Sequence, residues 1–249
     1  MQGYRLKFGS ELVVDVHPDG RIITSPSPGL SEITIDHFLA DQVHPRLIAH
    51  AGSLVVHAGG VRVGERALLV MGQSGRGKST LTASFDLAGM PLLGDDAMVI
   101  SMVGDQQAVR AVYPSLRLLP DSIDALMRGT ATAGPVAYYT SKERIDVAKD
   151  GGVAEAPIPI SAMFSIAPPN GNEPIVLRRL TPVDACMALV ESSFALDPSD
   201  TARARDRMEQ ASALARRVPA FEITYPRDYS RLPEVRQAIL DQVAALEPT

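Results

Sequence analysis

The chain has 249 residues, of which 45% are hydrophobic and 21% charged, and its 24 basic and 29 acidic side chains leave a formal net charge of −5. This length and composition are typical of a folded protein with a sizeable core and exclude a disordered or fibrous one. The acidic balance argues against a general nucleic-acid binder, which needs a basic surface for phosphate contacts. A single cysteine, Cys186, excludes internal disulfides and cysteine-rich zinc sites.

Neither the start of the chain nor its longest uncharged stretch has the character of a membrane or export segment. Residues 1–7 lack the apolar run of a signal peptide. The uncharged stretch Ala156–Asn172 is interrupted by prolines and is shorter than the roughly 20 apolar residues that span a bilayer. We therefore expect a cytoplasmic protein without a membrane partner.

The first fifty residues predict a small β unit followed by a helix. Strands at Leu12–Val16 and Arg21–Thr24 flank His17–Gly20, whose proline and glycine favour a tight turn. Apolar residues spaced along Ile35–His50 indicate one helical face, with Pro45 as a candidate kink.

Strands dominate the middle of the chain and helices the last third. Leu54–Ala58 and Ala67–Met71 are expected strands around a bend at Gly59–Gly60, and a helix over Ser79–Ala88 ends at Gly89. The remaining expected strands are Leu92–Leu93, Ala97–Ser101, Gln107–Val112, Glu143–Val147, Ile160–Ile166, Ile175–Leu177 and Phe221–Thr224. The remaining expected helices are Asp121–Met127, Pro182–Ser192, Ser199–Arg217 and Pro233–Leu246. This mixture predicts an α/β (mixed α+β) fold, with a small unit over residues 1–50 and one compact domain over 51–249.

One motif is more specific than any other pattern in the sequence. Gly72–Ser79 matches the phosphate-loop pattern G-x-x-x-x-G-K-[ST] (Walker A), for which the composition predicts about 0.003 chance matches. In such a loop the backbone N–H groups surround phosphates, Lys78 reaches the β- and γ-phosphates and the Ser79 hydroxyl ligates Mg²⁺. The flanking strand and helix disfavour the alternative, a glycine-rich turn that binds nothing. The residues expected to bind the nucleotide are Gly72, Gln73, Ser74, Gly75, Arg76, Gly77, Lys78, Ser79 and Thr80.

A pair of aspartates follows the phosphate loop closely. Asp95 and Asp96 come 17 and 18 residues after Lys78, so a short helix and a tight return would place Leu92–Asp96 beside the loop. Two carboxylates suit phosphoryl transfer, because one can hold Mg²⁺ while the other accepts the proton of an attacking hydroxyl. The alternative is an Asp-Asp sequence that caps a turn.

Together, His57-Ala58-Gly59, Gly72–Ser79 and Leu93–Asp96 resemble the catalytic domain of HPr kinase/phosphorylase over about residues 50–110. The resemblance implies a P-loop fold related to phosphoenolpyruvate carboxykinase, ATP and Mg²⁺ as ligands, a serine hydroxyl as acceptor, and homo-oligomers. It also implies Asp95 as the general base, Asp96 as a metal-side carboxylate, and His57 near the γ-phosphate.

The departures from that family point to a subgroup. Thr80 stands where the bifunctional enzymes have Glu, which argues against phosphorylase activity. The segments Asp41–Val43 and Tyr113–Asp121 are similar to compact HPr-kinase-like proteins that occur beside genes for lasso-peptide biosynthesis. Some of these proteins phosphorylate the precursor peptide on its carboxy-terminal serine.

Several basic side chains allow two interpretations. Arg117 is either a stabiliser of the transferred phosphoryl group or a partner in a surface salt bridge. Lys142 and Arg144 either line the acceptor site or belong to a solvated strand edge. His57 is either catalytic or a buried core histidine. The arginines of Ser199–Arg217 are expected to pair with acidic residues along a solvated helix.

The sequence thus predicts an ATP- and Mg²⁺-dependent serine/threonine-hydroxyl kinase with a peptide or small-protein acceptor, of which a lasso-type precursor peptide is the favoured example. One alternative is an HPr(Ser)-type carrier-protein kinase, and another is a nucleotide-binding regulator without transfer activity. The predicted catalytic residues are Asp95, His57, Lys78 and Arg117, and the predicted metal ligands are Ser79 and Asp96.

Overall fold

The computed structural model describes residues 3–113, 116–127, 133–135, 137, 140–145, 156–168 and 174–246. Its amino-terminal part is an antiparallel sheet of β1 (Tyr4–Phe8), β2 (Leu12–Val16) and β3 (Ile22–Pro26). The two expected strands are confirmed, and β1 is an addition that the sequence analysis missed. Alternate residues of β2 are buried against Phe38 and Val43 of the following helix, which gives this unit its own core.

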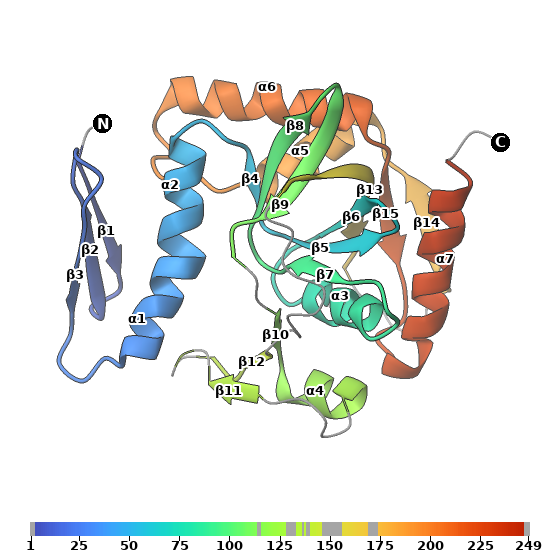
Figure 1. The fold of residues 1–249 in the computed structure, drawn as a ribbon, viewed down its shortest axis with the longest axis horizontal. Coiled ribbons are helices and arrows are strands. Elements are labelled where there is room, and N and C mark those ends of the chain that lie inside the picture. Colours follow the sequence, from blue (N-terminus) through green and yellow to red (C-terminus); the bar gives the residue numbers. More distant parts are fainter. Residues whose placement is uncertain are drawn as a thin grey trace.

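The expected helix is present in three continuous pieces. These are α1 (Glu32–Phe38), a π-helical turn (Leu39–Val43) and α2 (His44–His50). The helix begins earlier than expected because Ser31 caps it, its hydroxyl accepting from the Thr34 N–H at 3.3 Å. Pro45 has no N–H for the carbonyl four residues before it, which accounts for the loss of α-helical pairing in the π turn. Figure 1 shows this helix between the small sheet and the rest of the protein.

The rest of the protein is built on a nine-stranded mixed sheet. Seven of its strands follow one another in the order β4-β8-β9-β13-β6-β5-β7. The other two are β15, which pairs with β13, and β14, which pairs with β15. Its strands are β4 (Val55–Val56), β5 (Ala58–Val63), β6 (Arg66–Met71), β7 (Leu92–Gly94), β8 (Met98–Val103), β9 (Gln106–Ala111), β13 (Ile158–Ile166), β14 (Val176–Arg179) and β15 (Ala220–Thr224). The central strand β13 runs parallel to β6 and β15 and antiparallel to β9. The predicted mixed α/β fold is confirmed.

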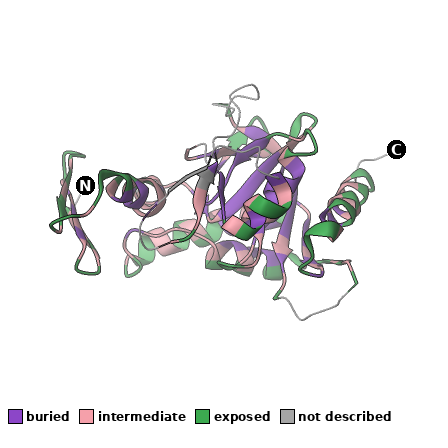
Figure 2. Cartoon of the chain, turned by 90° about the horizontal axis from the view of Figure 1, so that it is seen from below, coloured by how far each residue is buried: buried purple, intermediate pink, exposed green. Residues whose placement is uncertain are grey.

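Helices cover both faces of this sheet. They are α3 (Lys78–Asp86), α5 (Pro182–Glu191), α6 (Thr201–Arg217) and α7 (Leu232–Ala244). A further helix, α4 (Pro120–Met127), contacts α3 and the short 3-10 turn at Tyr229–Arg231. Leu69 and Met71 of β6 share one core with α5 and α6, whereas Leu68 and Val70 share another with α3 and α7. Strand β6 is therefore buried on both faces, as its continuous apolar run predicts, and the buried centre is seen in Figure 2.

A third, three-stranded sheet has the order β10-β12-β11 and consists of β10 (Leu116–Leu118), β11 (Ala133–Pro135) and β12 (Glu143–Ile145). Strand β12 lies in the middle of this sheet, so the expectation of a strand edge at Lys142 and Arg144 is wrong. The expected strand end at Asp146–Val147 and the Arg144 side chain lie outside the described residues. The expected ion pairs of α6 are confirmed, with Arg203–Asp206 at 3.5 Å and Arg205–Glu209 at 3.0 Å.

The expected bend at Gly59–Gly60 is also wrong, because both glycines lie inside β5. A Cβ on Gly59 would stand 2.6 Å from Thr82 Cγ2 of α3 and 3.5 Å from Asp95 Oδ1. The glycine is thus required by the close approach of α3 and the aspartate pair, which the sequence does not reveal.

Strand β7, which leads into the aspartate pair, hydrogen-bonds to β5 rather than to β6. Strand β5 therefore separates β7 from the strand that precedes the loop, while the aspartates after β7 lie beside the loop as expected, with Asp95 next to Ser79. No helix among the described residues is long and apolar enough to cross a bilayer.

Candidate active site

The phosphate loop joins the end of β6 to the start of α3. Three of its glycines, Gly72, Gly75 and Gly77, have φ angles of 144°, 76° and 93°, a region that favours glycine. Gln73 and Ser74 are exposed at the tip. The loop therefore has the strand-loop-helix setting and the backbone curvature that a phosphate-binding loop needs.

The Lys78 side chain lies inside the loop, with only 5% of the residue exposed. Its Nζ donates to the carbonyl oxygens of Gly72 at 2.8 Å and Gln73 at 3.3 Å. Burial lowers the pKa of Lys78, and the carboxylates of Asp95 and Asp96 oppose that shift. Arg76 folds back onto the loop, donating to the Ile166 carbonyl at 3.1 Å and to Gln73 Oε1 at 2.8 Å.

Asp95 is fully buried, and neither of its carboxylate oxygens has a hydrogen-bond partner among the described residues. Burial, reinforced by the charge of Asp96, raises the pKa of Asp95 to about 7. The neighbouring hydroxyl of Ser79 acts in the opposite direction and lowers it. A carboxyl group without partners in such a place is costly for stability and is typical of a functional site.

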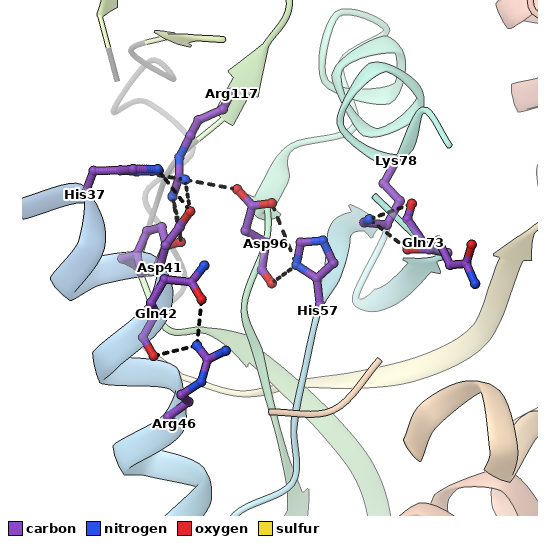
Figure 3. A network of polar contacts seen from close by, with 11 residues as sticks. His37, Asp41, Gln42, Arg46, His57, Gln73, Lys78, Asp96 and Arg117 are labelled. Atoms are coloured by element: carbon purple, nitrogen blue, oxygen red, sulfur yellow. Dashed lines mark hydrogen bonds and ion pairs between the residues drawn. The ribbon is translucent and has the colours of Figure 1, made fainter. Parts of the chain in front are cut away.

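Asp96 adopts φ = 73°, and it is the non-glycine residue with a positive φ in the described part of the chain. Its carboxylate lies between two basic side chains, with Oδ2 at 3.5 Å from Arg117 Nη1 and Oδ1 at 3.8 Å from His57 Nδ1. Figure 3 shows this arrangement. Backbone strain of this kind is concentrated at functional sites, where the surrounding structure holds the residue in place.

His57 precedes β5, the strand next to β6. Its Nδ1 donates to the Asp96 carbonyl oxygen at 2.8 Å, which leaves Nε2 of a neutral ring as an acceptor. Burial and the charge of Lys78 lower the pKa of His57, so the neutral ring is favoured at neutral pH. The side chain is 34% exposed and lines the site cavity, so His57 is not an enclosed core histidine.

Arg117 of β10 is buried, so the interpretation as a surface salt bridge is wrong. Both of its terminal nitrogens donate to the Asp41 carboxylate of the π turn. The same guanidinium donates to Tyr113 Oη at 2.6 Å and to His37 Nδ1 at 3.1 Å. This buried network fastens the amino-terminal helix to β10 and holds Arg117 beside Asp96.

These parts surround one cavity of about 1090 Å³. The phosphate loop forms one wall, and the helix of residues 37–46 forms the facing wall, with His57 and Asp96 between them (Figure 3). Thr80 and Lys142 also line the cavity, and the Thr80 hydroxyl lies 3.1 Å from that of Ser122. Every residue predicted for the site lines the cavity except Asp95, which is buried behind it.

Sequence reasoning missed the wall that faces the phosphate loop. His37, Asp41 and Arg46 line it, and Tyr113 holds its network together. Asp41 belonged to a segment with a family resemblance, but no role followed from it. The side chain pairs with a residue 76 positions later in the chain, and no local pattern shows such a pairing.

The residues present fit a magnesium ion shared with a nucleotide. Mg²⁺ takes oxygen ligands, commonly one or two carboxylates together with substrate phosphates and water. The Ser79 hydroxyl and the unpartnered Asp95 carboxylate offer such oxygens next to the phosphate loop. Among the described residues, no three His, Cys, Asp or Glu side chains gather into a metal site of their own.

No family model and no curated protein matches the sequence. Among solved structures, the HPr(Ser) kinase/phosphatase from Coxiella burnetii is similar to the chain at 14% identity and a TM-score of 0.40. The match covers 77% of this chain and 93% of that one.

Proposed function

We propose that the protein is an ATP- and Mg²⁺-dependent kinase that phosphorylates a serine or threonine hydroxyl of a peptide or small protein. The observation that carries the proposal is the single cavity in which a complete phosphate loop faces Asp96 and His57, with space beyond them for an acceptor. A pure nucleotide sensor has no need of a carboxylate held between the loop and an open acceptor space.

In this function the loop backbone and Lys78 bind the β- and γ-phosphates of ATP. The acceptor oxygen forms a bond to the γ-phosphorus while the bond from that phosphorus to the β–γ bridging oxygen breaks. ADP leaves, and the hydroxyl proton passes to a carboxylate. Bound Mg²⁺ neutralises charge on the phosphate oxygens, and we assign Arg117 the same task for the transferred group.

Burial favours exchanging the roles that the family resemblance implies for the two aspartates. Asp95 lies beside Ser79 and has no exposed atom, so we assign it to the metal side. Asp96 lines the cavity, and we assign it to the acceptor proton. His57 positions Asp96 through the hydrogen bond to its carbonyl, and the neutral ring leaves the charge of the carboxylate available to accept that proton.

The acceptor class that the sequence resemblance favours is a precursor peptide of the lasso type. The test is incubation with γ-labelled ATP, Mg²⁺ and either a serine-containing precursor peptide or HPr at equal concentration. We expect label in the peptide. Label in HPr alone would identify a carrier-protein kinase, and ATP binding without label in any acceptor would identify a regulator.

A further inference from the structure

We propose that Arg46 is the anchor for a carboxylate group of the acceptor. The inference rests on the proposed kinase function and narrows its substrate class to acceptors that carry a carboxylate close to the phosphorylated hydroxyl. It comes from the position of Arg46 in the cavity wall and from the partners that its guanidinium has and lacks.

Arg46 of α2 is half-buried and lines the site cavity. Its Nη1 donates to the Gln42 carbonyl oxygen at 2.7 Å and to Gln42 Oε1 at 2.8 Å. The guanidinium carbon lies 5.5 Å from the centre of the Phe194 ring, which stacks a cation against an aromatic face. These contacts fix the orientation of the side chain and occupy one of its three nitrogens.

No carboxylate of the described residues forms an ion pair with Arg46. The charge of Asp41, on the preceding turn, acts on Arg46, but the carboxylate oxygens of Asp41 accept hydrogen bonds from Arg117 and Tyr113. Glu191 lines the same cavity without pairing with Arg46. Among the described residues, neither Nε nor Nη2 of this half-buried guanidinium has a hydrogen-bond acceptor, so both can donate to an anion from outside the chain.

The anion that Arg46 would bind is not the nucleotide phosphate. The cations on the phosphate-loop side are Lys78, Arg76 and Lys142, and the charges of the last two act on Lys78. Figure 3 shows His57 and Asp96 between Lys78 and Arg46, so a group bound at Arg46 lies beyond the point of transfer. That is the side on which the acceptor must sit.

A carboxylate matches the two donors of Arg46, Nε and Nη2, that have no acceptor among the described residues. It is planar and accepts two parallel hydrogen bonds from one arginine, a geometry that lysine cannot reproduce. Two sources present this group next to a serine hydroxyl: the carboxy terminus of a chain that ends in serine, and a neighbouring Asp or Glu side chain.

The test uses three synthetic decapeptides of one sequence, each with a single serine at its end. The first ends in a free carboxylate, the second in an amide, and the third in an amide with Glu before the serine. For the wild type we expect a lower KM for the free acid than for the amide, and the third peptide reports whether a side-chain carboxylate substitutes. Equal KM values for all three peptides would overturn the anchor.

The substitution Arg46→Gln should raise the KM of the preferred peptide roughly tenfold to hundredfold, since one charged hydrogen-bonded contact is lost. We expect kcat and the KM of the plain amide to change little. Arg46→Lys should restore part of the preference, and Arg205→Gln, at an exposed ion pair on α6, serves as the matched control. An equal rise in KM for every peptide would show that Arg46 has a structural role and would overturn the anchor.

The same experiment separates failure of the proposed kinase function from failure of the anchor. If the wild type binds ATP and phosphorylates none of the three peptides or HPr, the kinase assignment fails, and the anchor falls with it. If it phosphorylates all three equally well, the kinase stands and only the anchor falls. Should Arg46→Gln not fold, Arg46→Lys decides the question, because a preference for the free acid that is unchanged in this variant would overturn the anchor.

Discussion

The two walls of the cavity are built in different ways. The phosphate-loop wall comes from consecutive residues between β6 and α3, and the groups that we propose for phosphate binding there are mostly backbone N–H groups. The facing wall is assembled from the helix of residues 37–46, from β10 and from residues 191–194, and its groups are side chains held by other side chains. In the proposed function the first wall binds the polyphosphate of the nucleotide and the second binds the acceptor.

This difference also predicts whether a mutation in each wall lowers activity alone or stability as well. A change in the phosphate-loop wall removes a binding or catalytic group from an intact backbone, so activity should fall while the fold persists. A change in the facing wall breaks a buried ion pair between distant segments, so stability should fall as well. The following predictions separate the two cases.

The largest effects are expected at the aspartate pair. Asp96→Asn keeps the size of the side chain but cannot accept the hydroxyl proton, so transfer should slow by roughly 10²- to 10⁴-fold with Mg·ATP affinity near that of the wild type. Asp95→Asn should instead raise the Mg²⁺ concentration needed, and added Mg²⁺ or Mn²⁺ should recover part of the activity.

Titrating metal against each aspartate variant decides the roles. Metal rescue of Asp96→Asn without rescue of Asp95→Asn would restore the order that the family resemblance implies. Full activity in both variants would leave the proposed kinase without a base.

Lys78→Ala should reduce transfer by about 10²-fold or more, because the charge that reaches the β- and γ-phosphates is lost. Nucleotide binding should weaken less, since the backbone of the loop remains, and thermal unfolding should show a preserved fold. Lys7→Ala, at an exposed position of β1, is the control. Undiminished turnover in Lys78→Ala would remove the phosphate-loop assignment.

Asp41→Asn tests the facing wall. The substitution removes the charge of the carboxylate that both terminal nitrogens of the buried Arg117 bind and leaves the more distant Asp96 carboxylate as its ionised partner, so the free energy of unfolding should drop by about 3 kcal/mol. Denaturant unfolding measures this. The exposed pair of Asp15 with Arg5 provides the matched variant Asp15→Asn, which should change stability little. An equal effect of the two substitutions would show that the Arg117 network does not hold the wall.

A smaller effect is expected in the pH dependence of stability, to which Asp95 contributes through its raised pKa. Its folded-state pKa of about 7 lies above the ordinary value of 3.8, so the folded protein holds a proton that the unfolded chain releases between these values. Without Mg²⁺ or nucleotide, this group should make the wild type less stable as pH rises from 4 to 7, by at most about 4 kcal/mol. Asp95→Asn should lack that component, and an unchanged profile would contradict the raised pKa.

Most of the phosphate-loop wall could be predicted from the sequence because its determinants are local. The motif Gly72–Ser79, the apolar strand before it and the helix after it are contiguous, and each appears in the structure as expected. Strand β1 was within reach as well, since Tyr4, Leu6 and Phe8 alternate with polar residues. Its alternation is the usual signal of a half-buried strand.

The sequence-based predictions were wrong where tertiary contacts override the local conformational preference of the residues. Gly59 and Gly60 resemble a turn, but they lie in β5 because Thr82 and Asp95 leave no room for a Cβ at Gly59. The burial of Arg117 depends on Asp41, and no sequence pattern around either residue indicates that the two form a pair. Contacts of this kind become visible only when the chain is folded.

The reaction that we propose for this cavity is the transfer of a phosphoryl group from ATP to an acceptor hydroxyl. The most direct measurement follows ADP and phosphoserine together in one reaction with a peptide acceptor and Mg²⁺. The predicted result is one phosphoester formed for each ADP released, with both products lost together in Lys78→Ala and in Asp96→Asn. ADP released without phosphopeptide, or phosphopeptide formed at the wild-type rate by either variant, would contradict the claim.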